Sequence, residues 1–407
     1  MALTPLGDAR ARVLHDCHRL ESARVPLDDA VGCVTTEAVV ADELVPPFAN
    51  TAMDGVAVRA ADTAGATADA PVRLRLVGTI AAGDPGDIEV GPGTAVRIMT
   101  GAPMPPGADA VVMVERTAPA EGAVDVMVEV AVGNHVRAAG DDLRPGDPVV
   151  AAGTELTPAH LGVLAGLGHL DVAVVRRARV AVLSTGDELV EGPGPLLPGQ
   201  IRDSNRRTLT ALVRETGAEA VDLGIVADHP DRIAAALREA VATCDAVVTS
   251  GGVSMGEFDH VKVVLDTIGE MEWMQVAIKP AKPLAFGTVE GVPVFGLPGN
   301  PVSSMVSFEL FARPGLRRMM GHESSGRMVV DAVADEGLHR QIDGKTHFAR
   351  VVAAWGDDGR FHVRSAGGQG SHQLSAMAAA NALAVVPDGH GVPPGGAVEV
   401  ILLGPLG

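Results

Sequence analysis

Residues 246–268 hold a short apolar run, two glycines and an amphipathic segment, in that order. The apolar run stops at Thr249 and Ser250, and Gly251 and Gly252 follow directly. Beyond the glycines, the apolar residues that recur at helical spacing are Val261, Val264, Leu265 and Ile268. This pattern predicts a β-strand, a glycine turn and a helix.

The glycine turn has the composition of an anion-binding site. Glycines let backbone N–H groups approach an anion closely, and the start of the next helix adds partial positive charge. Ser250 and Ser254 add hydroxyl donors, and Asp259 either caps the helix or holds a cation against a bound phosphate. A single turn of this kind is more often a plain connection than a ligand site, so the rest of the chain must decide.

Strands and helices alternate from Arg179 to about residue 310. The expected strands are 180–183, 220–226, 246–248, 276–278, 284–286 and 292–297, and the expected helices surround 208–213, 233–241, 261–268 and 305–310. Uniformly apolar strands alternating with helices are typical of a parallel, doubly wound α/β sheet.

Ligands of such sheets bind beyond the carboxyl ends of the strands. The residues that directly follow expected strands are Glu188, Asp228, Ser250, Gly251, Gly252, Lys279, Lys282 and the turn Pro298, Gly299, Asn300, Pro301. Each alone reads as a turn, a cap or a solvated charge, but their common placement favours one site. Lysines and glycine amides suit a phosphate or oxyanion, and carboxylates suit Mg²⁺.

Short strands and turns fill two other regions. Residues 46–140 alternate apolar and polar positions between glycine and proline turns, which predicts a small all-β module. Asp54 and Thr100 end apolar segments within it, and each alone reads as a turn residue. From about residue 327 the pattern is again short strands, typical of a small β-barrel or sandwich, with a polar loop at 367–372. Near the start, residues 8–20 predict an amphipathic helix.

Charge and cysteine content exclude several classes of protein. The 407 residues carry a net charge of −19, which argues against binding to nucleic acid or to an anionic membrane. Three widely spaced cysteines give neither a disulfide framework nor a zinc motif, so we expect a reducing compartment. No apolar run reaches the roughly 20 residues that span a bilayer, and no secretory leader is evident. We expect a cytoplasmic protein that binds small molecules.

Eight motifs together resemble the molybdopterin molybdenumtransferase family, which includes the E domain of gephyrin. In chain order they are PPFANTAMDGVAV, RIMTGAPMPPGADAVVMVE, LSTGDEL, DSNR, SGGVSMGEFDHVK, IKPAKP, GLPGNPVSS and QGSHQLSAMAAAN. The resemblance implies an enzyme that takes adenylylated molybdopterin and molybdate and forms molybdenum cofactor and AMP with Mg²⁺.

The resemblance also implies which residues form the site. The catalytic set is Asp54, Thr100, Asp142, Glu188, Asp228 and Asp259, and the Mg²⁺ ligands are Asp228, Asp259 and Glu188. The substrate-binding set is Ser250, Gly251, Gly252, Val253, Ser254, Lys279, Lys282, Pro298, Gly299, Asn300, Pro301, Ser303, Arg350 and Ser371.

A four-domain arrangement follows from the same resemblance and matches the breaks in composition. It comprises a linking domain (27–45 and 141–176), an inserted β module (46–140), a molybdopterin-binding α/β domain (7–26 and 177–326) and a C-terminal β-barrel domain (327–407). We expect a homodimer whose sites are shared across subunits, with a molybdopterin adenylyltransferase and recipient molybdoenzymes as further partners.

Four positions depart from the family pattern. Val56 and His260 stand where tyrosine is common, Ala281 replaces a glycine, and Gln275 replaces a lysine or arginine. The chain contains no tyrosine at all.

The departure at Gln275 removes a cation. If residues 275–279 form one strand, Gln275, Ala277 and Lys279 share a face, and Gln275 then lies near the proposed phosphate site. We expect weaker oxyanion binding than a lysine there would give, because a neutral amide supplies no full charge.

Two other functions stay open at this point. One is a molybdopterin adenylyltransferase, which resembles only the central domain, and the other is a non-catalytic scaffold of the gephyrin type. The flanking β regions argue against the first, and the complete set of carboxylates argues against the second.

Overall fold

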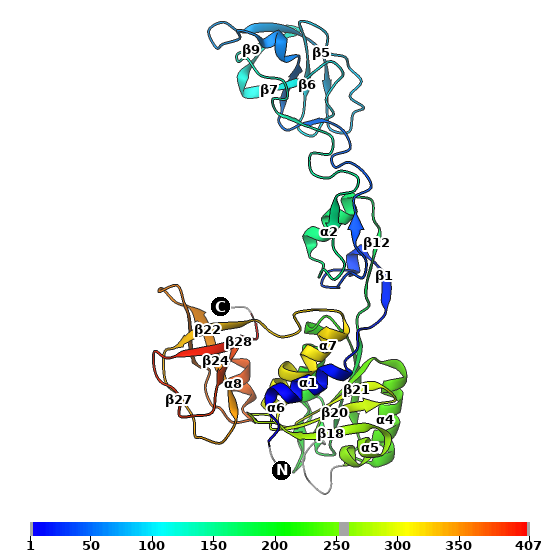
Figure 1. Cartoon of the computed structure of the whole chain (residues 1–407), viewed down its shortest axis with the longest axis vertical. Coiled ribbons are helices and arrows are strands. Elements are labelled where there is room, and N and C mark those ends of the chain that lie inside the picture. The colour runs from blue at the N-terminus through cyan, green and yellow to red at the C-terminus, as the bar shows by residue number, and fades with distance from the viewer. Residues whose placement is uncertain (1–2, 252–259, 405–407) are drawn as a thin grey trace. The chain divides into compact units, whose positions relative to one another are not determined.

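A computed structural model describes residues 3–251 and 260–404 (Figure 1). The chain divides into two compact units, which are described separately. The first comprises Met1–Arg24, Gly32–Thr36 and Ala173–Gly407, and the second comprises Val25–Val31 and Glu37–Val172. The expected division into four domains is finer than this and stays a prediction.

A six-stranded sheet forms the centre of the first unit. Its strand order is β16-β13-β17-β21-β20-β18. The bounds are β13 (Arg179–Thr185), β16 (Glu219–Val226), β17 (Ala246–Ser250), β18 (Glu270–Gln275), β20 (Pro283–Val289) and β21 (Val292–Leu297). The first four strands in this order run parallel, as expected from their apolar sequences and helical crossovers.

The expectation of a fully parallel sheet is wrong at β20. This strand runs antiparallel to both β18 and β21. Only Glu290 and Gly291 separate β20 from β21, and both have positive φ, which matches a tight hairpin turn. A two-residue connection joins antiparallel strands only, because a parallel pair needs a long crossover.

Helices cover both faces of the sheet, which confirms the doubly wound arrangement (Figure 1). One face packs against α1 (Leu6–Asp16), α3 (Asn205–Glu215), α6 (Pro301–Ser307) and α7 (Arg313–Met319), and the other against α4 (Pro230–Thr243) and α5 (His260–Ile268). A π-helical segment, η4 (Phe308–Ala312), joins α6 to α7. Helix α1 ends at Asp16, four residues earlier than expected.

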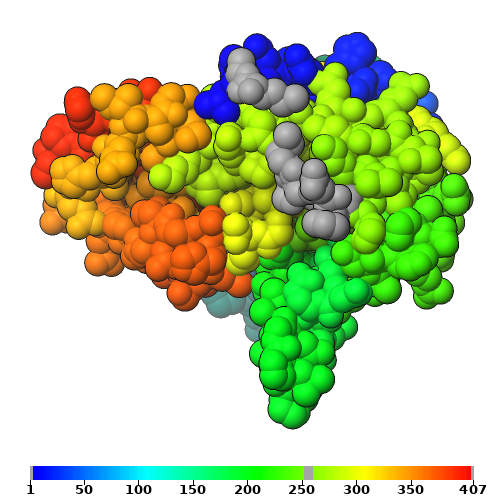
Figure 2. Space-filling model, turned by 90° about the horizontal axis from the view of Figure 1, so that it is seen from below, coloured from blue at the N-terminus to red at the C-terminus, as the bar shows by residue number. Residues whose placement is uncertain are grey.

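A closed barrel of five strands follows in the same unit. The order around it is β24-β25-β22-β28-β26, and β26 pairs back with β24. The bounds are β22 (Val329–Ala334), β24 (Thr346–Trp355), β25 (Phe361–Ser365), β26 (Ala382–Val386) and β28 (Ala397–Leu402), with α8 (Leu374–Ala378) between β25 and β26. Figure 2 shows the barrel residues, in orange and red, packed against the yellow and green α/β region. Phe348 and Leu383 belong to the same buried cluster as Leu316 of α7.

The expected strand 276–278 is wrong. Strand β18 ends at Gln275, and β19 (Ile278–Lys279) pairs with β24 of the barrel. This short apolar run therefore connects the central sheet to the barrel and is not a strand of the central sheet. Val276 and Ile278 within it are both fully buried. Gln275 and Lys279 therefore do not alternate along one strand, and the geometric basis for a role of Gln275 in oxyanion binding is lost.

The second unit contains the expected all-β module. Its sheet has the order β7-β4-β6-β5-β9-β8. The bounds are β4 (Gly55–Val58), β5 (Val72–Ile80), β6 (Thr94–Ile98), β7 (Ala110–Met113), β8 (Thr117–Ala120) and β9 (Ala123–Val126). Val56, the departure in the first motif, is buried among apolar side chains of this sheet.

Short elements complete the chain. In the second unit they are the strand pairs β2 (Val39–Val40) with β11 (Pro148–Val150) and β3 (Asn50–Thr51) with β10 (Val136–Arg137), helix α2 (Pro158–Gly166) and the 3₁₀ turns Leu27–Asp29, Ala60–Thr63 and Val114–Arg116. In the first unit they are β14 (Leu189–Val190), β15 (Ile201–Arg202), β23 (Leu338–His339) and β27 (Gly391–Val392). β1 (Ser22–Pro26) and β12 (Asp171–Val175) lie where the chain passes between units. No helix within residues 3–251 and 260–404 is long and apolar enough to cross a membrane.

Candidate functional site

The carboxyl ends of the parallel strands bring several predicted residues together. Ser184 of β13 and Leu297 of β21 each pair in register with Ser250 of β17. The Gly251 N–H donates to the carbonyl of Leu297 at 3.1 Å, which ties the glycine turn to the turn that begins at Pro298. We call Ser184, Ser250, Gly251, Leu297 and the turn that begins at Pro298 the strand-end cluster.

Asn205, at the start of α3, holds two of these strand ends together. Its Nδ2 donates to Ser250 Oγ and to the Gly299 carbonyl, both at 2.7 Å. One amide therefore fixes the distance between the glycine turn and the 298–301 turn. The motif DSNR was noted in the sequence, but no role was predicted for Asn205.

A buried ion network fixes the start of α3. Asp203 accepts from the Arg206 N–H at 3.1 Å and from Arg206 Nε at 3.0 Å, and it also accepts from Ser184 Oγ at 3.2 Å. Arg206 is 2% exposed and pairs with Asp222 as well. Burial opposes the charge of Arg206, but the hydrogen bonds that it donates to its carboxylate partners outweigh burial and raise its pKa. Asn205 thus projects from a rigid helix start.

Carboxylates lie at the same edge of the sheet. Thr185 of β13 pairs with Val226 of β16, so Glu188 and Asp228 follow neighbouring strand ends. The Asp228 N–H donates to Asp187 Oδ1 at 3.1 Å, a contact that sequence reasoning missed. Asp228 is half-buried and Glu188 is exposed. Within the described ranges, no three His, Cys, Asp or Glu side chains gather as a metal site, and the predicted ligand Asp259 lies outside those ranges.

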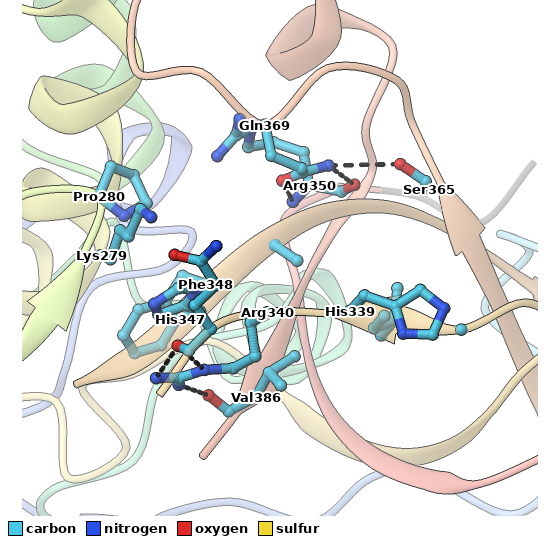
Figure 3. A pocket seen from close by; sticks show the side chains of 14 residues that line it. Lys279, Pro280, His339, Arg340, His347, Phe348, Arg350, Ser365, Gln369 and Val386 are labelled. Carbon is cyan, nitrogen blue, oxygen red and sulfur yellow. Dashed lines mark hydrogen bonds between the residues drawn. The ribbon is translucent and has the colours of Figure 1, made fainter. Parts of the chain in front are cut away.

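A cavity of about 420 Å³ lies where β19 meets the barrel. Lys279 and Pro280 form one wall, and Arg350 and Gln369 form another (Figure 3). His347 also lines it. The predicted residues Lys279 and Arg350, 71 positions apart in sequence, therefore face one space.

Arg350 is a buried cation without a counter-ion among the described residues. It is 1% exposed, and Nη2 donates to the carbonyls of Gly368 at 3.1 Å and Gly370 at 3.3 Å. Its Nε is buried and has no hydrogen-bond partner in the described part of the chain. Burial lowers the pKa of Arg350. A buried charge is costly unless it is paired, so this geometry favours an anionic ligand.

The 366–373 loop is held against Arg350 by Gln369. Gln369 Oε1 accepts from the Arg350 N–H at 2.9 Å, and Nε2 donates to the Arg350 carbonyl at 3.0 Å. The carbonyl of Ser371, in the same loop, accepts from the Val302 N–H at 3.1 Å, next to buried Ser303 of α6. The loop thus connects the cavity to the start of α6, directly after the 298–301 turn.

Asp54 and Thr100 meet in the second unit. Asp54 Oδ1 accepts from both the N–H and the hydroxyl of Thr100, each at 2.7 Å. These hydrogen bonds lower the pKa of Asp54. Asp54 lines a cavity of about 400 Å³ together with Arg97 and Met99. Asp142 is exposed, and its N–H donates to the carbonyl of Val45.

The remaining predicted residues have mixed outcomes. Gly252, Val253, Ser254 and Asp259 lie outside the described residues. Lys282 is exposed, and its carbonyl accepts from the Val276 N–H at 2.7 Å. Asn300 precedes α6 and Pro301 begins it, as the turn chemistry predicts.

The chain matches three described family regions in order. Residues 4–168 match the MoeA N-terminal region (domain I and II), residues 181–318 a probable molybdopterin binding domain, and residues 333–403 the MoeA C-terminal region (domain IV). A molybdopterin molybdenumtransferase from Haemophilus influenzae is 37% identical over 389 residues, which cover 95% of each chain. The chain belongs to the molybdopterin molybdenumtransferase family.

Other relatives agree with this membership. Molybdopterin molybdenumtransferase 2 from Mycobacterium tuberculosis is 41% identical over 373 residues, 89% of this chain and 90% of the relative. A crystal structure of the molybdopterin biosynthesis MoeA protein from Pyrococcus horikoshii matches with a TM-score of 0.80 and 29% identity, and the match covers 98% of this chain and 100% of the other. Family membership and the multidomain fold predicted from the motifs are both confirmed.

Proposed function

We propose that this protein inserts molybdenum from molybdate into adenylylated molybdopterin, forms molybdenum cofactor and releases AMP. The observation that carries the proposal is Arg350, a buried cation without a described counter-ion, in a cavity that it shares with Lys279. The loop at Ser371 joins this cavity to the strand-end cluster. The cavity is thus the proposed place for the oxyanion, and the adjacent strand-end cluster is the proposed place for the phosphate-bearing ligand.

The strand-end cluster is the proposed place for the adenylylated pterin. Backbone N–H groups of the glycine turn and hydroxyls of Ser250 and Ser254 suit its phosphate oxygens. The turn 298–301 and Ser303 border the same place. Lys279, Lys282, Arg350 and Ser371 are the proposed contacts of molybdate, which enters as a substrate.

Mg²⁺ is the proposed metal of the reaction. Oxygen ligands are the ones Mg²⁺ prefers, and Asp228, Glu188 and Asp259 are the proposed carboxylate ligands. One or two carboxylates together with phosphate oxygens and waters are enough to bind Mg²⁺. When bound, the ion neutralises charge that develops on the phosphate being cleaved.

We further propose a homodimer with shared sites, in which one subunit supplies Asp54 and Thr100 from its β module, and Asp142 from its linking domain, to the strand-end cluster of the other. Hydrogen bonds from Thr100 lower the pKa of Asp54, and its carboxylate accepts no other hydrogen bond from residues 3–251 and 260–404, so it stays available to a ligand. All three cysteines are free thiols, which fits a cytoplasmic enzyme. A molybdopterin adenylyltransferase and recipient molybdoenzymes are the proposed protein partners.

The alternatives are less well supported. A molybdopterin adenylyltransferase needs only the central domain, whereas this chain matches the N-terminal and C-terminal regions as well. A non-catalytic scaffold has no need for an unpaired buried arginine at a cavity, because such a charge lowers stability.

Substituting the carboxylates tests the proposed metal role. We expect Asp259→Asn and Asp228→Asn to fold normally. Their rate of AMP release should fall by at least about 100-fold, because the phosphate charge is no longer neutralised. Asp231→Asn is the matched control, because Asp231 is 94% exposed at the start of α4. Normal Mg²⁺-dependent AMP release by Asp259→Asn and Asp228→Asn would overturn the assignment.

A further inference from the structure

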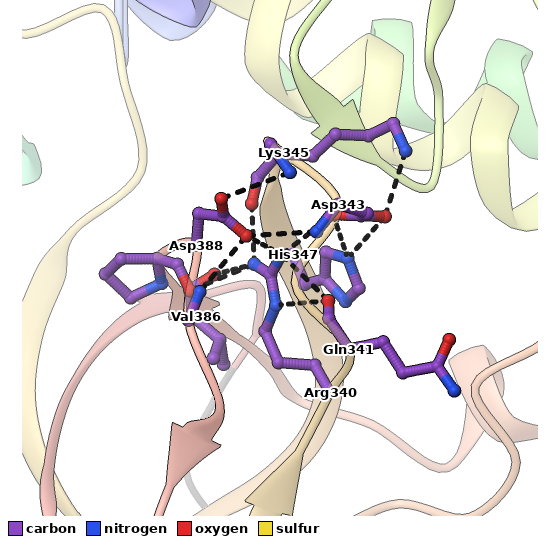
Figure 4. Close-up of polar contacts among 10 residues, drawn as sticks. Arg340, Gln341, Asp343, Lys345, His347, Val386 and Asp388 are labelled. Carbon is purple, nitrogen blue, oxygen red and sulfur yellow. Dashed lines mark hydrogen bonds and ion pairs between the residues drawn. The ribbon is translucent and has the colours of Figure 1, made fainter.

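Asp343 is the centre of a polar network beside the cavity (Figure 4). It accepts from Arg340 Nη2 at 2.7 Å and from Lys345 Nζ at 2.9 Å. Both of its oxygens also lie 3.2 Å from His347 Nε2. Arg340 is shared further with Asp388 at 2.6 Å. The negative charge of Asp343 is therefore divided among three partners, and only part of it acts on the imidazole.

His347 connects this network to the cavity. It lies on β24, directly paired with Lys279 of β19, and its side chain is 16% exposed. It lines the same space as Lys279 and Arg350 (Figure 3). Nε2 is engaged by Asp343, and no hydrogen bond of Nδ1 is found within the described ranges. Nothing in the preceding assignment gives His347 a role.

The charges around His347 oppose its protonation while the cavity holds no anion. Burial is the largest effect, and Lys279 from β19 and Arg340 from the preceding loop add repulsion. The hydrogen bond that the His347 ring donates to Asp343 acts in the opposite direction but does not outweigh them, so the pKa of His347 is lowered. The other charged groups of the network are Lys345, which pairs with Asp343, and Asp388, which pairs with Arg340. The lowered pKa favours the neutral ring, whose Nε2 lies within hydrogen-bond distance of Asp343.

We propose that His347 is a third anion-binding residue of this cavity, beside Lys279 and Arg350, and that it takes up one proton when an oxyanion enters. The inference rests on the proposed function only in taking an oxyanion as the ligand. A dianion cancels the repulsion from Lys279 and Arg340. The protonated ring then donates from one nitrogen to Asp343 and from the other to the anion. The proton comes from solvent, and no covalent bond changes.

Calorimetric titration with tungstate or molybdate tests the proton uptake directly. The full-length protein is titrated at pH 7.5 in two buffers of different ionisation enthalpy, neither of them phosphate. We expect uptake approaching one proton per bound ion. Affinity should also fall by up to about tenfold per unit as pH rises above 7, because the bound state holds the extra proton. Binding without proton uptake, or with no dependence on pH, overturns the proposal.

Two substitutions separate His347 from other titrating groups. In His347→Gln the glutamine amide can still donate a hydrogen bond but cannot titrate, so we expect weaker anion binding and no proton uptake. His339→Gln is the matched control, because His339 is exposed and lines the same cavity, and it should retain full uptake. Unchanged uptake in His347→Gln contradicts the proposal.

Two further measurements make the outcome independent of variant folding and of the proposed function. In the wild-type protein, the imidazole NMR signal of His347 should shift toward the protonated position when tungstate is added, and an unshifted signal contradicts the inference. AMP release is followed separately. Wild-type protein that releases AMP but takes up no proton refutes only the inference, whereas proton uptake without AMP release refutes only the proposed function.

Discussion

At the scale of one residue, the buried charge of Arg350 should lower the stability of the unliganded protein and provide a binding group for an anion. Its guanidinium is buried against two carbonyls with Nε unpaired among the described atoms. Arg350→Met should therefore raise the free energy of unfolding of the unliganded protein by about 1–2 kcal/mol, because a desolvated charge is replaced by an apolar chain of similar length. The same substitution should abolish tungstate binding. Urea denaturation and calorimetry measure the two effects.

Arg350→Lys is the control for this prediction. It keeps the charge but not the planar donor group, so it should remain as unstable as the wild type and bind tungstate more weakly. Loss of stability in Arg350→Met would show instead that the two carbonyl contacts outweigh the cost of burial.

Asn205 is the second residue whose role is local and testable. Its amide donates to Ser250 and to the Gly299 carbonyl, so Asn205→Ala should cost about 1–3 kcal/mol of stability and also raise KM for the pterin substrate. Asn205→Asp keeps the shape but cannot donate, and it places a negative charge against a carbonyl. We expect it to be at least as damaging in urea denaturation and in steady-state kinetics. If Asn205→Asp had the stability and KM of the wild type, the hydrogen bonds of Asn205 to Ser250 and the Gly299 carbonyl would contribute to neither.

Residue types at strand ends were predictable from sequence, but their partners were not. Ser250, Gly251 and the 298–301 turn follow apolar runs, and that local pattern is enough to place them. Asn205 and Gln369 act through contacts with residues 19 to 94 positions away, which no periodicity encodes. Ala281, which replaces a glycine of the family pattern, has a φ of +76°, in the left-handed region where a side chain is strained.

At the scale of elements, the Asp343 network fixes the segment before β24 to the turn after β26. Besides its bond to Asp343, Arg340 donates to the carbonyls of Val386 and Pro387, so the segment that leads into β24, and thus to His347, is held to the end of β26. Burial opposes ionisation of Asp343, but hydrogen bonds from Lys345 and His347 outweigh it and hold its pKa at about 2.

The depressed pKa of Asp343 makes part of the stability depend on pH. Its contribution is fully present above the ordinary carboxyl pKa and is lost as pH falls from about 4 to 2. The difference in unfolding free energy between wild type and Asp343→Asn should narrow by about 1–2 kcal/mol over that interval, a range that allows for partial solvent screening. Urea denaturation at several pH values measures it, with exposed Asp331→Asn as the control. A difference that stays constant with pH would contradict the assignment.

Most long elements were predicted, but β18 (Glu270–Gln275) was not, and the strand expected at 276–278 was wrong. Parallel strands such as β13 and β17 are buried on both faces, so their apolar runs identify them. The run at 276–278 is also apolar, but it does not join the central sheet, because the barrel supplies the pairing partner of β19. Only the tertiary arrangement determines which sheet so short a segment joins.

At the scale of the whole molecule, the proposed dimer makes a complementation test possible. Asp54→Ala and Asp259→Ala should each be inactive. If sites are shared between subunits, each mixed dimer retains one intact site, so random exchange should restore about a quarter of wild-type AMP release. No recovery after verified subunit exchange would contradict shared sites.

The most direct measurement of the central claim combines the wild-type protein with adenylylated molybdopterin, molybdate and Mg²⁺, and follows AMP and molybdenum cofactor together. We predict that molybdate accelerates AMP release, that one AMP appears for each cofactor formed, and that Arg350→Met removes the dependence on molybdate. AMP release that is absent, independent of molybdate, or not accompanied by cofactor would contradict the account.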